Sequence, residues 1–255
     1  MTRVIGVISG KGGVGKTTLV ANLAVALNNF GKKVTVVDCN ITTSHLGFCF
    51  GLYYYDKTLN DVLKQQASID DAIYYHKSGV EIIPASLSVE DLIGVDIAGL
   101  KYILDIPSTD IVLLDSAPGF GREAISVLNT CKEVIIVTTP FINAVTDVAR
   151  VTKIVNELGI KPIGVVLNMV KRRGYELTKR DVERFTGLPV VSKIPFDETI
   201  EKSLVVGKPI VEYQPYSRAS VEFMKLAAEL AGAHYSVPKS SAFLRFWNSL
   251  KQAFK

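Results

Sequence analysis

The sequence has few cysteines and no apolar run long enough to cross a membrane. Its three cysteines, Cys39, Cys49 and Cys131, show none of the spacings typical of metal sites or disulfide frameworks. No apolar stretch approaches the roughly 20 residues that a membrane-spanning helix requires. Residues 1–3 lead directly into an apolar run, without the features of a signal peptide. These absences predict a protein of the reducing cytoplasm whose cysteines are small core residues.

Acidic residues are absent from residues 234–255, which contain four of the 29 lysines and arginines. The other 25 basic residues balance the 25 acidic residues of positions 1–233. The net charge of +4 therefore belongs entirely to this final segment. A basic segment of this kind favours an anionic binding partner, which can be either lipid or nucleic acid.

Short β-branched runs alternate with longer helical patterns along most of the chain. Hydrophobic residues make up 48% of the sequence and the mean hydropathy is +0.26, as expected for strands buried on both sides. We predict strands at Val4–Ile8, Lys33–Val37, Val80–Pro84, Ile111–Asp115, Val134–Thr138, Ile163–Asn168 and Val190–Ile194. We predict helices at Lys16–Phe30, Leu59–Ile73, Ile97–Leu104, Arg122–Leu128, Val145–Leu158, Thr178–Phe185, Thr199–Leu204 and Ser217–Ala233. This order predicts an α/β fold with a mostly parallel sheet and helices on both faces.

The chain divides into one domain and a short appendage. Residues 1–233 carry the alternating pattern and form the predicted domain. Residues 234–241 contain Pro and Ser without periodicity, which is typical of a linker. Residues 242–255 are periodic again and form a predicted amphipathic helix.

A glycine-rich loop follows the first predicted strand and opens the first predicted helix. It matches the phosphate-loop pattern G-x-x-x-x-G-K-[ST] with Gly10, Lys11, Gly12, Gly13, Val14, Gly15, Lys16 and Thr17. The glycines let backbone N–H groups converge on phosphate oxygens, and the start of the helix adds the positive end of its dipole. Lys16 would reach the β- and γ-phosphates, and the Thr17 hydroxyl would bind Mg²⁺.

Lys11 is a second lysine in this loop, and it reveals a family resemblance. Residues Ser9 to Thr18 resemble the deviant Walker A motif of MinD/ParA-type ATPases. The resemblance covers roughly residues 2–232 and implies a three-layer P-loop NTPase fold that uses ATP or ADP with Mg²⁺. It also implies an ATP-bound homodimer in which each Lys11 reaches the phosphates of the partner.

Two predicted strands end in carboxylates that could complete this site. Asp115 ends a buried run as a Walker B residue would, and residues 116–119 resemble the switch II segment of the family. Asp38 occupies the switch I position, where the family usually shows Asp-x-Asp, whereas this chain has Asn40. His45 also stands where the resemblance leads us to expect Asn. We predict Thr17, Asp38 and Asp115 as metal-site residues, although an Asp at a strand end can simply cap the next helix.

The departure at position 40 predicts slow hydrolysis. The resemblance implies catalytic roles for Lys11, Lys16, Asp38 and the residue at position 40. A carboxylate there could orient the attacking water and accept its proton, whereas the Asn40 amide can orient water but is not a base. Water positioning alone could nevertheless suffice.

The base site and one helix position are predicted mainly from the resemblance. Asn168, at the end of a predicted strand, would read the adenine edge, although Asn is also an ordinary turn former. Pro195 and Phe196 would form a second wall of the base site. Asp147 stands where relatives carry an interface or partner-contact acid, but it could equally be a solvated residue at a helix start.

The final periodic segment has an aromatic side opposite a basic one. On a helix, one side would carry Ala253 and the candidate membrane-contact residues Phe243, Phe246, Trp247, Leu250 and Phe254. Arg245, Lys255 and amide side chains would lie opposite, which describes a helix in the plane of a membrane surface. The same position carries the membrane-targeting helix in MinD-like proteins. Alternatively, this segment packs on its own domain.

Several functions fit these features. The leading interpretation is a MinD-like ATPase that acts from the inner face of the cell membrane, with an unidentified protein partner or activator. A regulator of flagellar number resembling FlhG shares the motifs and a tail helix. A ParA-like DNA segregation ATPase could use Lys171–Arg173, Lys179 and Arg180 on phosphates, but the balanced charge of residues 1–233 disfavours nucleic acid. A metal-cluster carrier like the nitrogenase iron protein is disfavoured because no paired cysteines are suitably placed.

Overall fold

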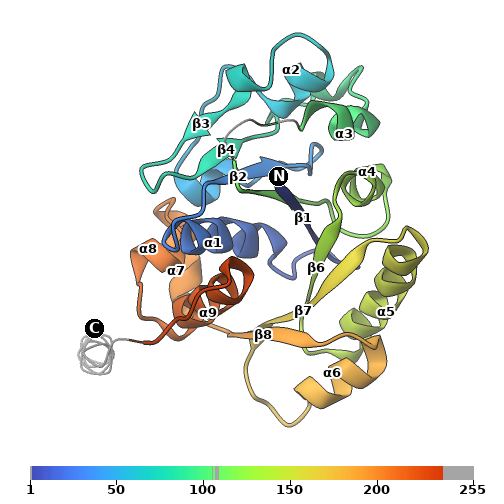
Figure 1. Cartoon of the computed structure of the whole chain (residues 1–255), viewed down its shortest axis with the longest axis vertical. Helices are drawn as coiled ribbons and strands as arrows, with labels where there is room; N and C mark the ends of the chain where they lie inside the picture. The colour runs from blue at the N-terminus through green and yellow to red at the C-terminus, as the bar shows by residue number, and fades with distance from the viewer. Residues whose placement is uncertain (1, 105, 107–108, 238–255) are drawn as a thin grey trace.

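A computed structural model describes residues 2–104, 106 and 109–237. Its described strands form one sheet of eight in the order β3-β4-β2-β5-β1-β6-β7-β8 (Figure 1). All neighbouring strands are parallel except β3 and β4. The strands are β1 Arg3–Ile8, β2 Val34–Asp38, β3 Tyr74–Tyr75, β4 Glu81–Ile83, β5 Ile111–Asp115, β6 Glu133–Thr138, β7 Lys161–Val170 and β8 Val190–Pro195. The predicted α/β fold is confirmed.

Helices cover both faces of this sheet and bury two separate cores. One core lies between the sheet and α1, α8 and α9, and the other lies against α2, α4, α5 and α6. The bounds are α1 Lys16–Asn28, α2 Leu59–Leu63, α3 Leu100–Ile103, α4 Arg122–Thr130, α5 Ile142–Glu157, α6 Lys179–Thr186, α7 Glu198–Val205, α8 Ile210–Tyr213 and α9 Arg218–Ala231. Short 3-10 helices occupy η1 Gly47–Phe50, η2 Asp70–Ala72, η3 Glu90–Leu92 and η4 Ile97–Gly99.

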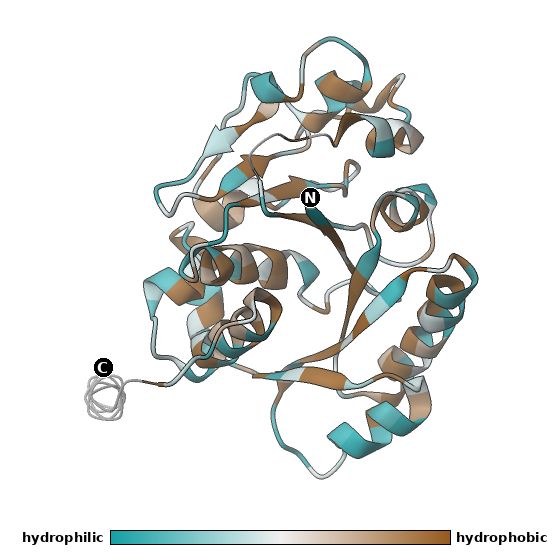
Figure 2. Cartoon of the chain, viewed as in Figure 1, coloured by the Kyte–Doolittle hydropathy of each residue, from teal (hydrophilic) through white to brown (hydrophobic). Residues whose placement is uncertain are grey.

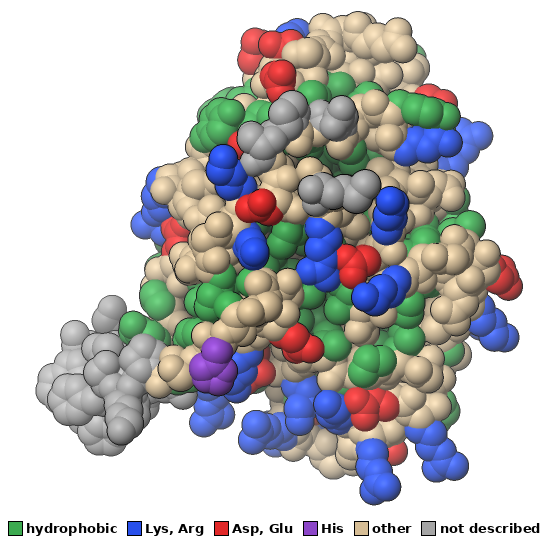
Figure 3. All heavy atoms as spheres, in the orientation of Figure 1, with side chains coloured by type: hydrophobic (Ala, Val, Ile, Leu, Met, Phe, Trp, Pro, Cys, Tyr) green, Lys and Arg blue, Asp and Glu red, His purple; other side chains and the backbone are tan. Residues whose placement is uncertain are grey.

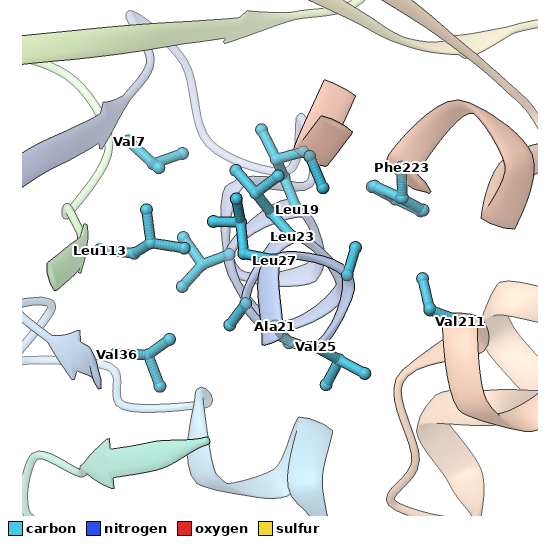
Figure 4. Packing of buried hydrophobic residues seen from close by; sticks show 14 of the residues in the cluster. Val7, Leu19, Ala21, Leu23, Val25, Leu27, Val36, Leu113, Val211 and Phe223 are labelled. Atoms are coloured by element: carbon cyan, nitrogen blue, oxygen red, sulfur yellow. The ribbon is translucent and has the colours of Figure 1, made fainter. Parts of the chain in front are cut away.

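Helix α1, which follows the phosphate loop, is buried along most of its length. Its residues Leu19, Leu23 and Leu27 pack with strand residues such as Leu113, while Phe223 of α9 closes the other side (Figure 4). Buried residues occur on all faces of α1. A helix that is apolar all round is expected to pack between other elements rather than on the surface. The central strands are mostly hydrophobic, as their brown colour in Figure 2 shows. The three cysteines are buried and free, as expected of core residues.

Two predicted helices are wrong in extent. The predicted helix Leu59–Ile73 ends at Leu63, because Gln65 takes a positive φ of 60° that a helix interior does not allow. The Ser68 backbone N–H and hydroxyl then donate to Asp71, at 2.9 and 2.7 Å, and begin a separate turn. The predicted helix Ile97–Leu104 is instead the 3-10 turn η4 followed by α3.

Other boundaries lie close to those predicted, with two short additions. Helix α5 begins at Ile142 rather than Val145, and β3 and α8 were not predicted. Ser217 caps α9 as predicted, since its hydroxyl accepts from the Ser220 N–H at 3.0 Å. Among the described residues, no helix combines the length and apolar character needed to cross a bilayer. The predicted amphipathic helix at 242–255 lies outside the described residues.

The parallel strands bring the predicted site residues to one edge of the sheet. The carboxyl ends of β1, β2 and β5 are adjacent because these strands pair in register. The phosphate loop follows β1, and Asp38 and Asp115 end β2 and β5 as direct register partners. In open parallel sheets, ligands bind at this carboxyl edge.

Candidate functional site

The phosphate loop has the backbone conformation that its glycines predict. Gly13 and Gly15 have φ values of 74° and 90°, in the region that favours glycine. Helix α1 begins at Lys16 directly after the left-handed Gly15. The Gly119 N–H, from the loop after β5, donates to the Ser9 carbonyl at 3.0 Å. The loop therefore presents a helix start to an anion, with the segment after Asp115 bound beside it.

Close backbone approaches fix this loop between two other elements. A Cβ added at Gly10 would lie 2.4 Å from the Cβ of Asp147 in α5. A Cβ added at Gly15 would lie 2.2 Å from the side-chain nitrogen of Asn168. Asp147 was predicted as either a partner contact or a solvated residue, and its backbone and Cβ lie against the loop. Its carboxylate accepts from Arg150 at 3.3 Å.

The two lysines of the loop have opposite environments. Lys16 is 7% exposed, and burial lowers the pKa of its ammonium while the nearby Asp115 opposes that shift. Lys11 is exposed on the outer side of the loop. Among the described residues, it takes part in no ion pair. Lys16 is thus positioned to act inside the site, and Lys11 faces outward.

Asp115 has the features of a ligand for a hard cation. It is 1% exposed, and its Oδ1 has no hydrogen-bond partner in the described part of the chain. Burial, together with the charge of Asp38, raises the pKa of the Asp115 carboxyl to about 8, while a hydrogen bond with Thr17 opposes the shift. An unpartnered buried oxygen beside a threonine hydroxyl suits Mg²⁺, which takes one or two protein oxygens and keeps other positions for water and phosphate. Among the described residues, no group of three or more His, Cys, Asp or Glu side chains could hold a metal ion.

Asp38 has a second role that the sequence did not reveal. Its Oδ2 accepts from the Ser44 hydroxyl at 2.8 Å and from the N–H groups of His45 and Leu46, both at 3.1 Å. Its Oδ1 accepts from the Asn40 N–H at 3.1 Å. Burial raises the pKa of Asp38, and these bonds oppose the shift. Asp38 therefore organises the loop of residues 40–46, and its place among the metal-site residues stays a prediction.

The side chain of Asn40 faces its own loop. Its Nδ2 donates to the carbonyl and the hydroxyl oxygen of Thr43, both at 2.9 Å. The Thr43 hydroxyl donates back to Asn40 Oδ1 at 3.1 Å. A carboxylate could not make the first of these bonds, because it has no donor. His45 is exposed, and its ring meets Phe48 edge-on at 6.1 Å between centroids.

A bulge turns Asn168 toward the phosphate loop. The register of β7 with β8 shifts between Leu167 and Val170, and Met169 takes a φ of 58°. Asn168, 5% exposed, then donates from Nδ2 to the Val14 carbonyl at 2.8 Å. This is the only side-chain hydrogen bond of Asn168 within the described residues, so its amide oxygen and second N–H can still serve a base.

The second predicted wall of the base site lies at the end of the neighbouring strand. The Phe196 N–H donates to the Val170 carbonyl at 3.0 Å, which holds Pro195 and Phe196 beside the end of β7. Phe196 is 40% exposed, and the Lys171 ammonium lies 4.1 Å from its ring centroid. The fold thus brings together Asn168, Pro195, Phe196 and the phosphate loop at one edge.

The basic residues considered for nucleic acid are partly engaged elsewhere. The Glu176 carboxylate accepts from the backbone N–H groups of Lys171 and Arg173, which orders this turn but does not engage the two basic side chains. Lys179 donates to the Val190 carbonyl at 3.0 Å and lies 3.5 Å from Glu183. Figure 3 shows several basic side chains and fewer acidic ones at the end of the molecule that carries α6.

A family model and several known proteins match the chain. The model of the CobQ/CobB/MinD/ParA nucleotide binding domain matches residues 5–210. The chain is 37% identical over 237 residues to an uncharacterized ATP-binding protein of Methanocaldococcus jannaschii, covering 92% of this chain and 90% of the relative. It is 32% identical over 269 residues to the septum site-determining protein MinD of Thermotoga maritima, covering 100% and 97%. It is 29% identical over 241 residues to the antiactivator FleN of Pseudomonas aeruginosa, covering 89% and 86%.

Solved structures agree with this match. MinD of Pyrococcus horikoshii, complexed with Mg-ADP, is 34% identical with a TM-score of 0.87, covering 90% of this chain and 96% of that one. A chain of the MinC:MinD cell division complex of Aquifex aeolicus is 25% identical with a TM-score of 0.80, covering 93% and 99%.

Proposed function

Because the chain belongs to the CobQ/CobB/MinD/ParA family and is a P-loop ATPase that uses ATP or ADP with Mg²⁺, we propose that it is a MinD-like spatial regulator. Two copies pair face to face around ATP, and the paired protein holds a membrane surface through residues 242–255. In this state it recruits or positions a protein partner on the inner face of the cell membrane. Hydrolysis of ATP ends the pairing.

The residues of the carboxyl edge would divide the work of holding the nucleotide. Backbone N–H groups of residues 10–15 and the Lys16 ammonium bind the phosphates. Thr17 and Asp115 hold Mg²⁺, which neutralises charge on the phosphate oxygens. Asn168 and the Pro195–Phe196 segment bind the base. Asp38 keeps the 40–46 loop closed beside the phosphates through its four hydrogen bonds.

The contrast between the two lysines of the loop carries the proposed pairing. Lys16 is buried beside Asp115 and serves its own nucleotide. Lys11 is exposed at the same edge, where it can reach phosphates held by a second copy. Two anionic nucleotides that face each other require additional cations between them. Lys11 supplies one cation from each side.

Membrane attachment would come from the opposite edge of the sheet. Helix α1 has 13 residues and runs for about 20 Å away from the phosphate loop. At its far end, Phe30 meets the Tyr235 ring edge-on, and Arg3 donates to the Leu230 carbonyl at the end of α9. The chain therefore enters the 234–241 linker far from the pairing edge. Pairing and membrane binding then use different surfaces.

Two weak membrane contacts would act together in the pair. Burial of four large apolar side chains of the 242–255 segment contributes roughly 6 kcal/mol, less the cost of ordering it. One segment alone gives reversible attachment. Two segments on one dimer bind far more strongly, because the second contact is intramolecular. ATP would thus control membrane affinity through pairing.

Pairing is tested by measuring mass in solution with saturating Mg·ATP or Mg·ADP. We expect a dimer with ATP only, and a monomer for Lys11→Ala with both nucleotides. Lys11→Ala should bind ADP as the parent does, whereas Lys16→Ala should lose nucleotide and serves as the control. A parent protein that remains monomeric with Mg·ATP would refute the proposal.

Membrane docking is tested with the only tryptophan of the chain, Trp247. Its emission should shift to the blue on anionic vesicles with ATP, and less with ADP. Phe246→Glu should abolish the shift without changing dimer mass. No shift with either nucleotide would contradict membrane docking.

The likeness to the antiactivator FleN supports a second function of the same regulatory class. The resemblance to FlhG-like regulators of flagellar number suggests which process such a regulator would serve. A DNA-binding role like that of ParA is the alternative from another class, through the exposed Arg172 and Arg173. Salt-sensitive retention on DNA by a chain ending at Ala233 would favour it over membrane binding.

A further inference from the structure

A carboxylate outside the predicted site connects the two loops that flank the phosphates. Glu123 is the second residue of α4, which follows the 116–121 loop. Its Oε1 accepts from the Thr42 N–H at 3.0 Å and from the Thr42 hydroxyl at 2.7 Å. Thr42 lies in the 40–46 loop, 81 positions earlier in the chain. Glu123 Oε1 thus accepts two hydrogen bonds from the 40–46 loop.

The Thr42 contact fixes the outer part of a loop whose inner part Asp38 already holds. The Asp38 carboxylate binds the N–H groups of Asn40, His45 and Leu46. Asn40 and Thr43 bond to each other, so they do not attach the loop to another element. Within the described residues, Glu123 provides the only side-chain hydrogen bonds from this loop to α4. Without it, residues 41–43 are held only by their own segment.

Glu123 is also connected to the phosphate loop through its own segment. The Gly119 N–H donates to the Ser9 carbonyl at 3.0 Å, so the loop before α4 is bound to residues before Gly10. The positive end of the helix dipole favours a carboxylate in the first turn of a helix, which is where Glu123 lies. A charged acceptor makes stronger hydrogen bonds than a neutral one. The contact is therefore suited to hold both loops in one arrangement.

We propose that Glu123 is a positioning residue for ATP hydrolysis, which holds the 40–46 loop against α4 through Thr42. The proposal deepens the proposed function, on which it rests, by giving the loop that bears Asn40 a fixed orientation toward the nucleotide. The contact between Glu123 and Thr42 restricts the movement of the loop that carries Asn40. An amide can orient the attacking water only if the loop that carries it is held in place. Glu123 itself acts through Thr42.

The test compares Glu123→Ala with Glu123→Gln, because glutamine keeps an oxygen that can accept both Thr42 donors. We expect kcat to fall at least about tenfold in Glu123→Ala, as for loss of a hydrogen bond to a charged group. KM and the ADP dissociation constant should change less than about twofold, and Glu123→Gln should recover most of kcat. Glu157→Ala is the control, because Glu157 is an exposed glutamate at the C-terminal end of another helix, α5.

Hydrogen exchange at the Thr42 amide gives a readout that does not depend on activity. The amide should be protected in the parent and in Glu123→Gln, and should exchange at least about tenfold faster in Glu123→Ala. Adding Thr42→Val to Glu123→Ala should cause little further loss of kcat, because both changes remove the same contact.

Three results would overturn the proposal. Unchanged kcat in Glu123→Ala would mean that the contact has no part in hydrolysis. A kcat in Glu123→Gln as low as in Glu123→Ala would assign the effect to charge rather than to the Thr42 contact. Unchanged exchange at the Thr42 amide would show that Glu123 does not hold the loop. The pairing assay with Lys11→Ala and the vesicle assay with Phe246→Glu test the proposed function without involving Glu123. A negative result in those assays is therefore distinguishable from these three results.

Discussion

Replacing Asp115 by asparagine should make the nucleotide-free protein more stable while removing its response to Mg²⁺. The Asp115 carboxyl is buried, has an unpartnered oxygen, and has a pKa raised to about 8 by burial and by Asp38. In the unfolded chain the same carboxyl has its ordinary value of 3.8. Above pH 3.8 the unfolded state therefore releases a proton that the folded state retains, and unfolding becomes easier as pH rises. Above about pH 8 both states are ionised, and the penalty stays constant.

The size of the effect follows from the separation of the two pKa values. Each unit corresponds to about 1.4 kcal/mol, so a neutral residue at this position gains at most roughly 4 kcal/mol of stability at pH 7. Lys16 lies beside Asp115 and loses an attraction in the variant. We therefore expect a gain of about 1 to 4 kcal/mol, growing by up to about 1.4 kcal/mol per pH unit between pH 5 and 7.

Urea denaturation of both proteins without nucleotide, at pH 5, 6, 7 and 8, measures this difference. Titrating groups that do not interact with Asp115, including His76, whose pKa burial lowers, contribute equally to both proteins and cancel. Mg·ADP should raise the parent's midpoint strongly and the variant's weakly. A free-energy difference that is independent of pH, or a variant that is less stable at pH 8, would refute the reasoning about Asp115.

Three further predictions concern the loops around the phosphates. Gly10→Ala should weaken nucleotide binding at least about tenfold, because the added Cβ would lie 2.4 Å from the Cβ of Asp147. Gly12→Ala is the control, since its added Cβ would meet nothing closer than 3.8 Å. Equal effects of the two substitutions in a binding titration would contradict the close approach at Gly10. Asn168→Ala should weaken nucleotide binding by about tenfold, because the Val14 carbonyl loses its bond; unchanged affinity by calorimetry would argue against this role. Asn40→Asp should raise steady-state turnover, because a carboxylate can accept the proton of the attacking water. Asn40→Ala is the control, since it removes the hydrogen bonds to Thr43 without adding a carboxylate. No gain in Asn40→Asp would show that position 40 does not limit hydrolysis.

Local sequence patterns predicted most of the fold because most elements depend on their own residues. The phosphate loop joins a β-branched run to an apolar helix, and each part has a strong local preference. Ser217 caps α9 with a bond to a residue three positions later, which a sequence shows directly. The predicted helix at 59–73 failed because its end depends on Gln65, whose left-handed backbone carries no sequence signal as strong as glycine. Strand β3 has two residues and exists only because β4 lies beside it.

The parts of the site that the sequence did not reveal depend on distant contacts. Asn168 contacts Val14, 154 positions away, and Glu123 contacts Thr42 across 81 positions. The residue types alone were informative for Lys16, Thr17 and Asp115, because phosphate and Mg²⁺ require lysine, hydroxyl and carboxylate groups at fixed spacings. They were not informative for Asp38, because an aspartate can either accept hydrogen bonds from a loop or bind a metal, and the residue type does not distinguish these roles. Only the four donors around Asp38 distinguish the two roles.

The placement of the two ends of α1 constrains how ATP can control membrane binding. The phosphate loop begins this helix, and the Phe30–Tyr235 contact lies just beyond its end. A conformational signal from nucleotide to the 234–241 linker would have to move α1, whose residues from Leu19 to Leu27 are almost fully buried between the sheet, α8 and α9. A helix packed on all sides resists such movement, because close packing leaves no space for it to shift. The proposed pairing through the exposed Lys11 would require no movement of this core, and it would double the number of proposed membrane segments. Control by pairing is therefore the mechanism that this architecture favours over a signal transmitted through each subunit.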